Sequence, residues 1–165
     1  MSIELLEEIA GIFEKKGIDY WVIGGYALDI AVGRLTREHK NTDFLIKIED
    51  SGRASRALEK KGFVTSYVHD RIAAEKDGMK AKLIPIEKTD GHYSIPTLNV
   101  FAEIPNSLMK PVKGKLKGRA YKRVPNELLY LFTRYSPNPS DALIADNLKI
   151  NKNSLKQIKI VVRRR

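Results

Sequence analysis

The 165-residue sequence contains no cysteine, which excludes a disulfide framework, a thiol nucleophile and a zinc site built on thiolates. It has no run approaching the roughly 18 apolar residues that a membrane-spanning helix needs. Its first residues, MSIELLEE, are acidic and amphipathic, unlike a signal peptide. A P-loop and a dinucleotide fingerprint are also missing. We therefore expect a cytoplasmic protein with no membrane association.

Acidic residues become scarce along the chain, so the net charge of +10 is unevenly distributed. Residues 1–50 hold ten acidic and six basic residues, a net of −4, whereas residues 51–165 hold ten acidic and 24 basic residues, a net of +14. Basic clusters bind polyanions. The stretches from Lys110 to Arg123 and from Lys149 to Arg165 contain no acid, which makes nucleic acid a candidate partner. A solvated face and a frayed chain end are the simpler alternative.

Hydrophobic periodicity predicts α and β elements in alternation, followed by a run of helices. The predicted helices cover residues 3–16, 26–32, 51–61, 126–135, 141–150 and 154–162. The predicted strands cover residues 18–23, 43–49, 63–68, 79–86, 93–101 and 120–124. We expect an α+β fold in which a core over 1–124 carries a small mixed sheet, backed by helices 3–16 and 51–61. A helical segment over 125–165 is expected to pack on this core.

The most informative segment spans residues 21–48 and reads WVIGGYALDIAVGRLTREHKNTDFLIKI. A predicted strand ends in Gly24-Gly25, and a helix follows at once. Backbone N–H groups at the start of that helix would face an open site and suit phosphate oxygens. A Gly-Gly pair is common in turns, so this feature alone is weakly diagnostic.

The residues after this helix strengthen the phosphate interpretation. Arg34, Arg37 and His39 crowd one loop, and arginine can bind phosphate oxygens through two parallel hydrogen bonds. Asn41 and Asp43 occupy alternate positions at the start of a strand, so their side chains point to the same face. Two oxygen-bearing side chains there can hold Mg²⁺ between them and a nucleoside triphosphate.

This pattern resembles the nucleotidyltransferase superfamily with the polymerase-β-like core, and more narrowly the small lincosamide and aminoglycoside nucleotidyltransferases. The matching residues are Gly24, Gly25, Tyr26, Ala27, Leu28, Asp29, Gly33, Arg34, Thr36, Arg37, His39, Asn41 and Asp43. A looser similarity continues through Arg123, Leu128, Leu129, Tyr135, Asp141, Asn147, Leu148 and Lys149, so it covers most of the chain.

The resemblance implies transfer of a nucleoside monophosphate from a nucleoside triphosphate (NTP) to a hydroxyl acceptor that the sequence leaves unknown. It implies that Asp43 holds Mg²⁺ with Asn41 as a weak second ligand. The residues expected to cradle the phosphates are Gly24, Gly25, Arg34, Arg37 and His39. A lincosamide or aminoglycoside acceptor is implied by the resemblance alone, and the basic charge of residues 51–165 argues against such a drug.

The sequence departs from the family where the metal ligands are expected. The family has carboxylates at both positions of its Asp-x-Asp pair, but here the first is Asn41. Its third carboxylate, on a later strand, aligns with Lys82. Asp43 would then remain as the single confident carboxylate, and Mg²⁺ binding would be weak or absent. Other carboxylates that could supply the missing charge are Glu75, Asp77 and Glu87.

Three explanations of Asn41 stay open: an introduced substitution, a naturally degenerate site, or an active site with rearranged ligands. The main hypothesis is a nucleotidyltransferase-like protein with a degenerate metal site, in which Asn41, Asp43 and Lys82 occupy the catalytic positions. The alternative is a non-catalytic module that binds nucleotide or nucleic acid on the same fold.

Overall fold

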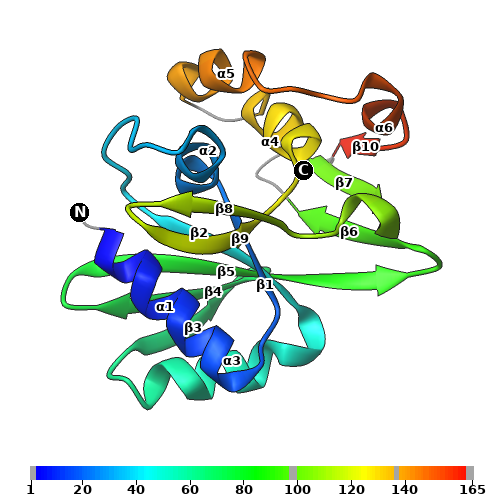
Figure 1. Ribbon diagram of the computed structural model, residues 1–165. Helices are drawn as coiled ribbons and strands as arrows, with labels where there is room; N and C mark the ends of the chain where they lie inside the picture. Colours follow the sequence, from blue (N-terminus) through cyan, green and yellow to red (C-terminus); the bar gives the residue numbers. More distant parts are fainter. Residues whose placement is uncertain (1–2, 97–99, 136–137, 163–165) are drawn as a thin grey trace.

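The structure is a computed structural model that describes residues 3–96, 100–135 and 138–162 (Figure 1). Part of the strand predicted over 93–101 lies outside these residues, as do the arginines at 163–165 that end the second basic stretch. The described helices are α1 (Ile3–Lys16), α2 (Gly25–Val32), α3 (Ser51–Glu59), α4 (Asn126–Thr133), α5 (Pro139–Asp146) and α6 (Lys152–Lys156). The described strands are β1 (Tyr20–Ile23), β2 (Thr42–Lys47), β3 (Val64–Val68), β4 (Arg71–Lys76), β5 (Met79–Thr89), β6 (His92–Pro96), β7 (Val100–Pro105), β8 (Val112–Leu116), β9 (Arg119–Arg123) and β10 (Lys159–Val162).

These elements confirm the predicted α+β fold and its mixed sheet. The strand order is β10-β7-β6-β5-β2-β1-β9-β8, and the β3–β4 hairpin joins the sheet through β5. The pairs β1–β9 and β2–β5 are parallel, and the other pairs are antiparallel. The long strand β5 pairs with β2 and β4 along its first part and with β6 near its end.

The sheet is larger than the sequence predicts, because β4 and β8 are not recognisable from their composition and β10 lies in a segment predicted as helix. Strand β4 reads RIAAEK and β8 reads VKGKL, so alanine, glycine and charged residues dilute the β-formers. Their pairing with β5 and β9 makes them strands. In addition, the single strand predicted over 93–101 contains parts of two strands, β6 and β7.

The helix predicted over 154–162 is wrong in its second half. Helix α6 ends at Lys156, and Lys159–Val162 forms β10, antiparallel to β7. The β-branched run from Ile160 to Val162 favours a strand once the β7 edge is available. The chain after residue 125 thus adds a strand as well as helices, and its division from a 1–124 core stays a prediction.

The strands β1 and β2 separate the main core from the face that carries the site. Phe13 of α1 packs against Tyr20 and Phe44, with ring centroids 5.7–6.2 Å apart, on the side where α1 and α3 lie (Figure 1). Because side chains alternate along a strand, Asp43 and Lys47 of β2 point to the opposite face. No helix in the described part of the chain has the length and apolar character that a membrane span requires.

Candidate functional site

A cleft of about 720 Å³ opens where β1 ends and α2 begins. This volume lies within the range of known ligand pockets. One wall comes from the loop before β2, another from β4, β5 and β6, and a third from residues near the start of α5. Seven of the eight predicted site residues line it: Gly24, Gly25, Arg37, His39, Asn41, Asp43 and Lys82.

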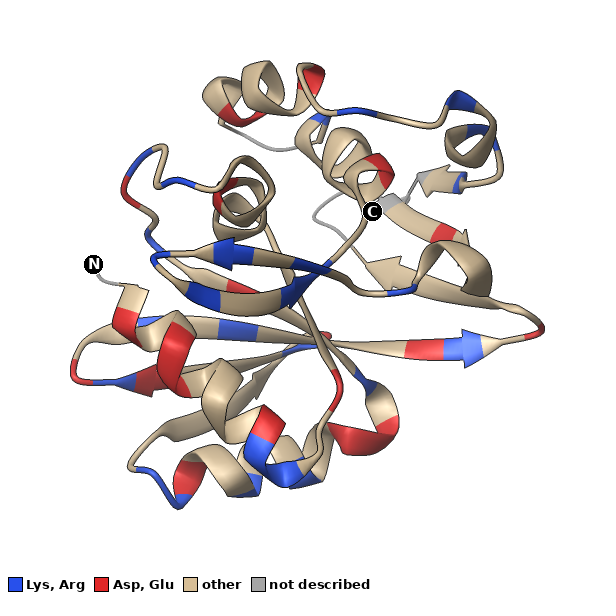
Figure 2. Cartoon of the chain, in the orientation of Figure 1, with Lys and Arg blue, Asp and Glu red and all other residues tan. Residues whose placement is uncertain are grey.

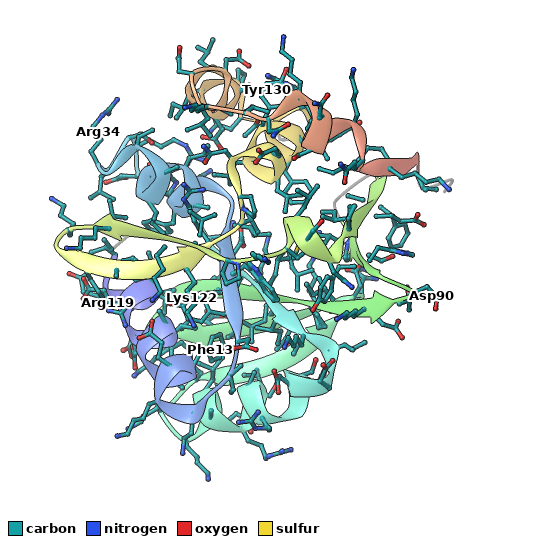
Figure 3. The ribbon with its side chains drawn as sticks, turned by 45° about the vertical axis from the view of Figure 1, so that its right-hand side comes forward. Phe13, Arg34, Asp90, Arg119, Lys122 and Tyr130 are labelled. Carbon is teal, nitrogen blue, oxygen red and sulfur yellow. The ribbon has the colours of Figure 1, made fainter. Side chains whose placement is uncertain are left out.

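Arg34 is the predicted phosphate ligand that does not line the cleft. It is exposed in the loop after α2, and Figure 3 shows its side chain extending away from the molecule. Its position follows from Gly33, whose left-handed backbone ends α2 and sends the chain outward. Phosphate binding by Arg34 stays a prediction.

The Gly24-Gly25 turn needs glycine at both positions, for different reasons. Gly24 has a φ of +74°, and a Cβ there would lie 3.0 Å from Oδ2 of Asp43. A Cβ on Gly25 would lie 2.2 Å from Nδ1 of His39. The backbone at the start of α2 thus packs directly against the side chains of the site, as the strand–turn–helix prediction requires.

Asp29 on α2 holds the loop that carries the predicted site residues. Its carboxylate is fully buried and accepts hydrogen bonds from the Thr36 backbone N–H at 3.1 Å and the Thr36 hydroxyl at 2.5 Å. Nε2 of His39 lies 2.5 Å from the second carboxylate oxygen. His39 is itself 4% exposed, and its ring lies tilted against the Tyr26 ring, with centroids 4.4 Å apart. This geometry gives His39 the role of orienting the loop, while its contact with phosphate stays a prediction.

Arg37 reaches across the cleft to the start of α5. Its Nε and Nη2 each donate to one oxygen of Asp141, both at 3.0 Å, and its Nη1 donates to the Glu38 carbonyl at 2.8 Å. The hydrogen bond to the buried Asp141 carboxylate is the main cause that raises the pKa of Arg37. Because its guanidinium is already engaged, Arg37 clamps the loop to α5. Local sequence patterns do not predict this contact, since the two residues lie 104 positions apart.

Asp43 and Lys82 are register partners on the adjacent parallel strands β2 and β5. The Oδ1 atom of Asp43 is buried and has no hydrogen-bond partner among the residues that the structure describes. Burial raises the pKa of Asp43, while the charges of Lys82, Arg71 and His39 act in the opposite direction. Arg71 also lines the cleft, and sequence reasoning missed it because the strand β4 that begins there was not predicted.

None of the three alternative carboxylates lines the cleft. Glu75 is exposed on β4 opposite Lys80, Asp77 lies in the β4–β5 turn, and Glu87 is exposed near the end of β5. Asn41 directly precedes β2 and does line the cleft. The position beside Asp43 on the neighbouring strand is occupied by Lys82, and none of these three carboxylates takes its place in the cleft.

A protein-family model described as aminoglycoside-2''-adenylyltransferase matches residues 5–96, more than half of the chain. The chain belongs to this family. The match contains the turn at Gly24, the loop held by Asp29, and both Asp43 and Lys82. The family resemblance that the sequence predicts is confirmed.

Individual relatives of the aminoglycoside-2''-adenylyltransferase family agree with this assignment. A 2''-aminoglycoside nucleotidyltransferase from Klebsiella pneumoniae is 28% identical over 61 residues, which make up 37% of this chain and 34% of that relative. The match thus spans about a third of the relative's length.

Solved structures share the fold over nearly the whole chain. The lincosamide antibiotic adenylyltransferase LnuA, with lincomycin bound, has a TM-score of 0.72 and 19% identity, covering 90% of this chain and 99% of LnuA. The solution structure of the antibiotic-resistance factor ANT(2'')-Ia has a TM-score of 0.73 and 18% identity, covering 94% of this chain and 87% of that protein. At these identities the likeness establishes the nucleotidyltransferase fold.

Proposed function

We propose that the cleft binds a nucleoside triphosphate whose phosphates are held by side-chain cations in place of a catalytic metal. Nucleotidyl transfer to a hydroxyl acceptor is then strongly impaired, so the chain is a nucleotidyltransferase-like protein with a degenerate metal site. The observation that carries this proposal is the lysine beside the buried carboxylate: Lys82 is the strand partner of Asp43.

The donor set of the cleft does not fit a catalytic Mg²⁺ centre. Mg²⁺ prefers carboxylate oxygens in near-octahedral geometry, usually with substrate phosphates in its shell. At the expected ligand positions, Asp43 supplies one carboxylate, Asn41 supplies a neutral amide, and Lys82 adds a positive charge that repels a cation. The cleft is also lined by Glu38 and Asp141, and the Asp141 carboxylate is already bound by Arg37. In the described part of the chain, no three His, Cys, Asp or Glu side chains gather into a metal-binding group. A divalent ion is therefore expected to bind weakly.

The same residues suit phosphate oxygens without a metal. Lys82 and Arg71 line the cleft near the turn at Gly24-Gly25, where the N-terminus of α2 begins. A helix N-terminus and two cations attract a triphosphate. Charge-assisted hydrogen bonds from lysine and arginine to phosphate are among the stronger ones in proteins. Arg37 contributes less, because Asp141 already satisfies much of its guanidinium.

The other half of the cleft is apolar and offers space for the nucleobase or an acceptor. It is lined by Ile84 of β5, Ile95 of β6 and Phe132 of α4. An ANT(2'')-Ia structure that shares the fold was solved with adenylyl-2''-tobramycin. For this chain we propose the nucleotide as ligand and leave the acceptor unassigned.

The proposal is tested by measuring ATP binding calorimetrically in buffer that contains EDTA. Lys82→Met should weaken ATP binding by about tenfold or more, because one charge-assisted contact is lost. Lys80→Met is the matched control, since Lys80 lies two residues earlier on the same strand, is exposed and does not line the cleft. Its affinity should stay within about twofold. Equal affinities for Lys82→Met and the parent protein would contradict the proposal.

A second candidate function is nucleic-acid binding by the basic surface. Figure 2 shows Lys and Arg positions, in blue, along both strands of the β8–β9 hairpin. This hairpin contains most of the stretch from Lys110 to Arg123. The other stretch, from Lys149 to Arg165, is distributed over α6, β10 and residues 163–165, which lie outside the described residues.

A further inference from the structure

A second hollow, of about 260 Å³, lies at the opposite end of β1, β2 and β5 from the cleft. The cleft is lined by Asp43 at the start of β2, and the second hollow by Lys47 at its end. Four residues of extended chain separate these two positions by about 13 Å. Because Asp43 and Lys47 are an even number of residues apart, they point to the same face of the strand. The two sites are thus distinct hollows along one face of the sheet.

Lysines from four separate parts of the chain converge on this second hollow. Lys47 ends β2, Lys88 belongs to β5, Lys110 precedes β8, and Lys122 belongs to β9. Among the described residues that line the hollow, Asp19 is the single acidic one, and it pairs with Lys47 at 2.9 Å. The hollow therefore has a strong positive excess that attracts anions.

The floor of the hollow is rigid. Trp21 is 4% exposed, and its Nε1 donates to the Met109 carbonyl at 2.8 Å. Its ring meets Tyr93 edge-on, with centroids 6.1 Å apart. These contacts fix the chain directly before Lys110. Asn106 also lines the hollow, and within the described part of the chain its buried side-chain oxygen has no hydrogen-bond partner.

A row of lysines continues from the hollow along the β8–β9 hairpin. Lys113 of β8 is the register partner of Lys122, and Lys115 lies two residues further on the same face. Figure 2 shows the blue segments on both strands, and Figure 3 shows the position of Lys122. Like charges placed directly opposite each other destabilise a sheet. This cost indicates that the lysines serve a ligand rather than the fold.

We propose that the hollow and this lysine row bind the phosphodiester backbone of a nucleic acid, with one nucleotide phosphate seated in the hollow. The proposal deepens the second candidate function above and is independent of nucleotide binding in the cleft. The hollow is smaller than pockets that enclose a whole small-molecule ligand. Lys113 and Lys115 extend the positive charge beyond it, as a polymer requires and a small anion does not.

The test measures fluorescence anisotropy of labelled 20-nucleotide RNA and DNA at several salt concentrations. The double variant Lys110→Gln/Lys122→Gln removes two charges from the hollow. The matched control Lys152→Gln/Lys156→Gln removes two charges from α6, in the other basic stretch. We expect the hollow variant to lose about tenfold or more in affinity. Its slope of log affinity against log salt concentration should be smaller by about 1–2. The affinity of the control variant should change less than threefold. Comparing RNA with DNA identifies which polymer is the source of the phosphodiester.

Three results would overturn the proposal: no salt-dependent binding of either polymer, equal losses in both double variants, or displacement of the oligonucleotide by an equal concentration of pyrophosphate. The last result would indicate a small-anion site instead. Lys88→Gln is a further test of the hollow, because it replaces a single exposed lysine. Unchanged thermal unfolding of all variants would exclude misfolding as the cause of lost affinity. Lys82→Met should leave oligonucleotide binding unchanged, so failure of the cleft proposal and failure of this one are distinguishable.

Discussion

Asp43 and Lys82 occupy partner positions on two adjacent parallel strands, β2 and β5, with both residues lining one cleft. Asp43 is a buried carboxylate, and its Oδ1 accepts no hydrogen bond from residues 3–96, 100–135 or 138–162. Lys82 brings a positive charge to the position next to it. Under the proposed function, this pairing favours an anion over a divalent cation at the centre of the cleft.

Replacing Asp43 with asparagine is expected to stabilise the unliganded protein at neutral pH. Burial raises the pKa of Asp43 above its unfolded value, so the folded state disfavours the ionised form. The resulting loss of stability is absent below the unfolded pKa, grows as the pH rises from there, and is complete above the folded pKa. Asp43→Asn should therefore raise the unfolding free energy at pH 7, and this gain should vanish below the unfolded pKa of the aspartate, near pH 3. Chemical denaturation at several pH values measures this difference.

Asp19→Asn is the control for that experiment, because Asp19 is an exposed acid whose carboxylate pairs with Lys47. It should produce no gain in unfolding free energy at neutral pH. A loss of stability in Asp43→Asn at pH 7 would contradict the interpretation of the buried carboxylate.

Removing the Asp29 side chain should be among the most destabilising single changes at the site. Asp29→Ala leaves the Thr36 N–H and hydroxyl and the His39 ring without their shared partner. Unfolding free energy should fall by about 2–4 kcal/mol, because buried polar groups lose their hydrogen bonds. Thr36→Val, which removes one of these bonds, should cost about 1 kcal/mol. Equal stability of Asp29→Ala and the parent protein would show that Asp29 does not hold the loop.

The clamp between Arg37 and Asp141 should appear as a coupling energy. A double-mutant cycle with Arg37→Gln and Asp141→Asn is expected to give about 1–3 kcal/mol, since the contact is bidentate and Asp141 is buried. The exposed pair Arg134 and Asp146 serves as the comparison and should show little coupling. Similar coupling in both pairs would mean that the clamp adds nothing beyond a surface contact.

The contact between Gly25 and His39 allows a test of the turn. Gly25→Ala places a Cβ against the His39 ring and should lower the unfolding free energy by about 1–3 kcal/mol. In a His39→Ala background the same change should cost much less, because the obstructing ring is absent. Thermal or chemical denaturation of the four proteins measures the difference, and an undiminished cost in the His39→Ala background would exclude this ring as the cause.

The sequence predicts the local features of the site well and its long-range contacts poorly. The turn at Gly24, helix α2 and the start of β2 follow from spacing within one short segment. Strands β4 and β8 depend on pairing with neighbours, so their own composition does not reveal them. For the same reason the sequence does not reveal Arg71 as a cleft residue. The sequence predicts phosphate binding by Arg37, whereas in the structure the Arg37 guanidinium is bound to Asp141 across the cleft. Neither the burial nor the pairing of a side chain is visible in single-sequence periodicity.

The central claim is that side-chain cations, rather than a metal ion, hold the phosphates in the cleft. It is tested most directly by calorimetric titration of ATP with and without Mg²⁺, for the parent protein and for Asn41→Asp/Lys82→Asp, which places carboxylates at both altered positions. We expect the parent protein to bind ATP with affinities within about threefold in the two buffers. The double variant should bind at least tenfold more tightly with Mg²⁺ than without it. Parent protein that binds ATP in the presence of Mg²⁺ and not in its absence would contradict the claim.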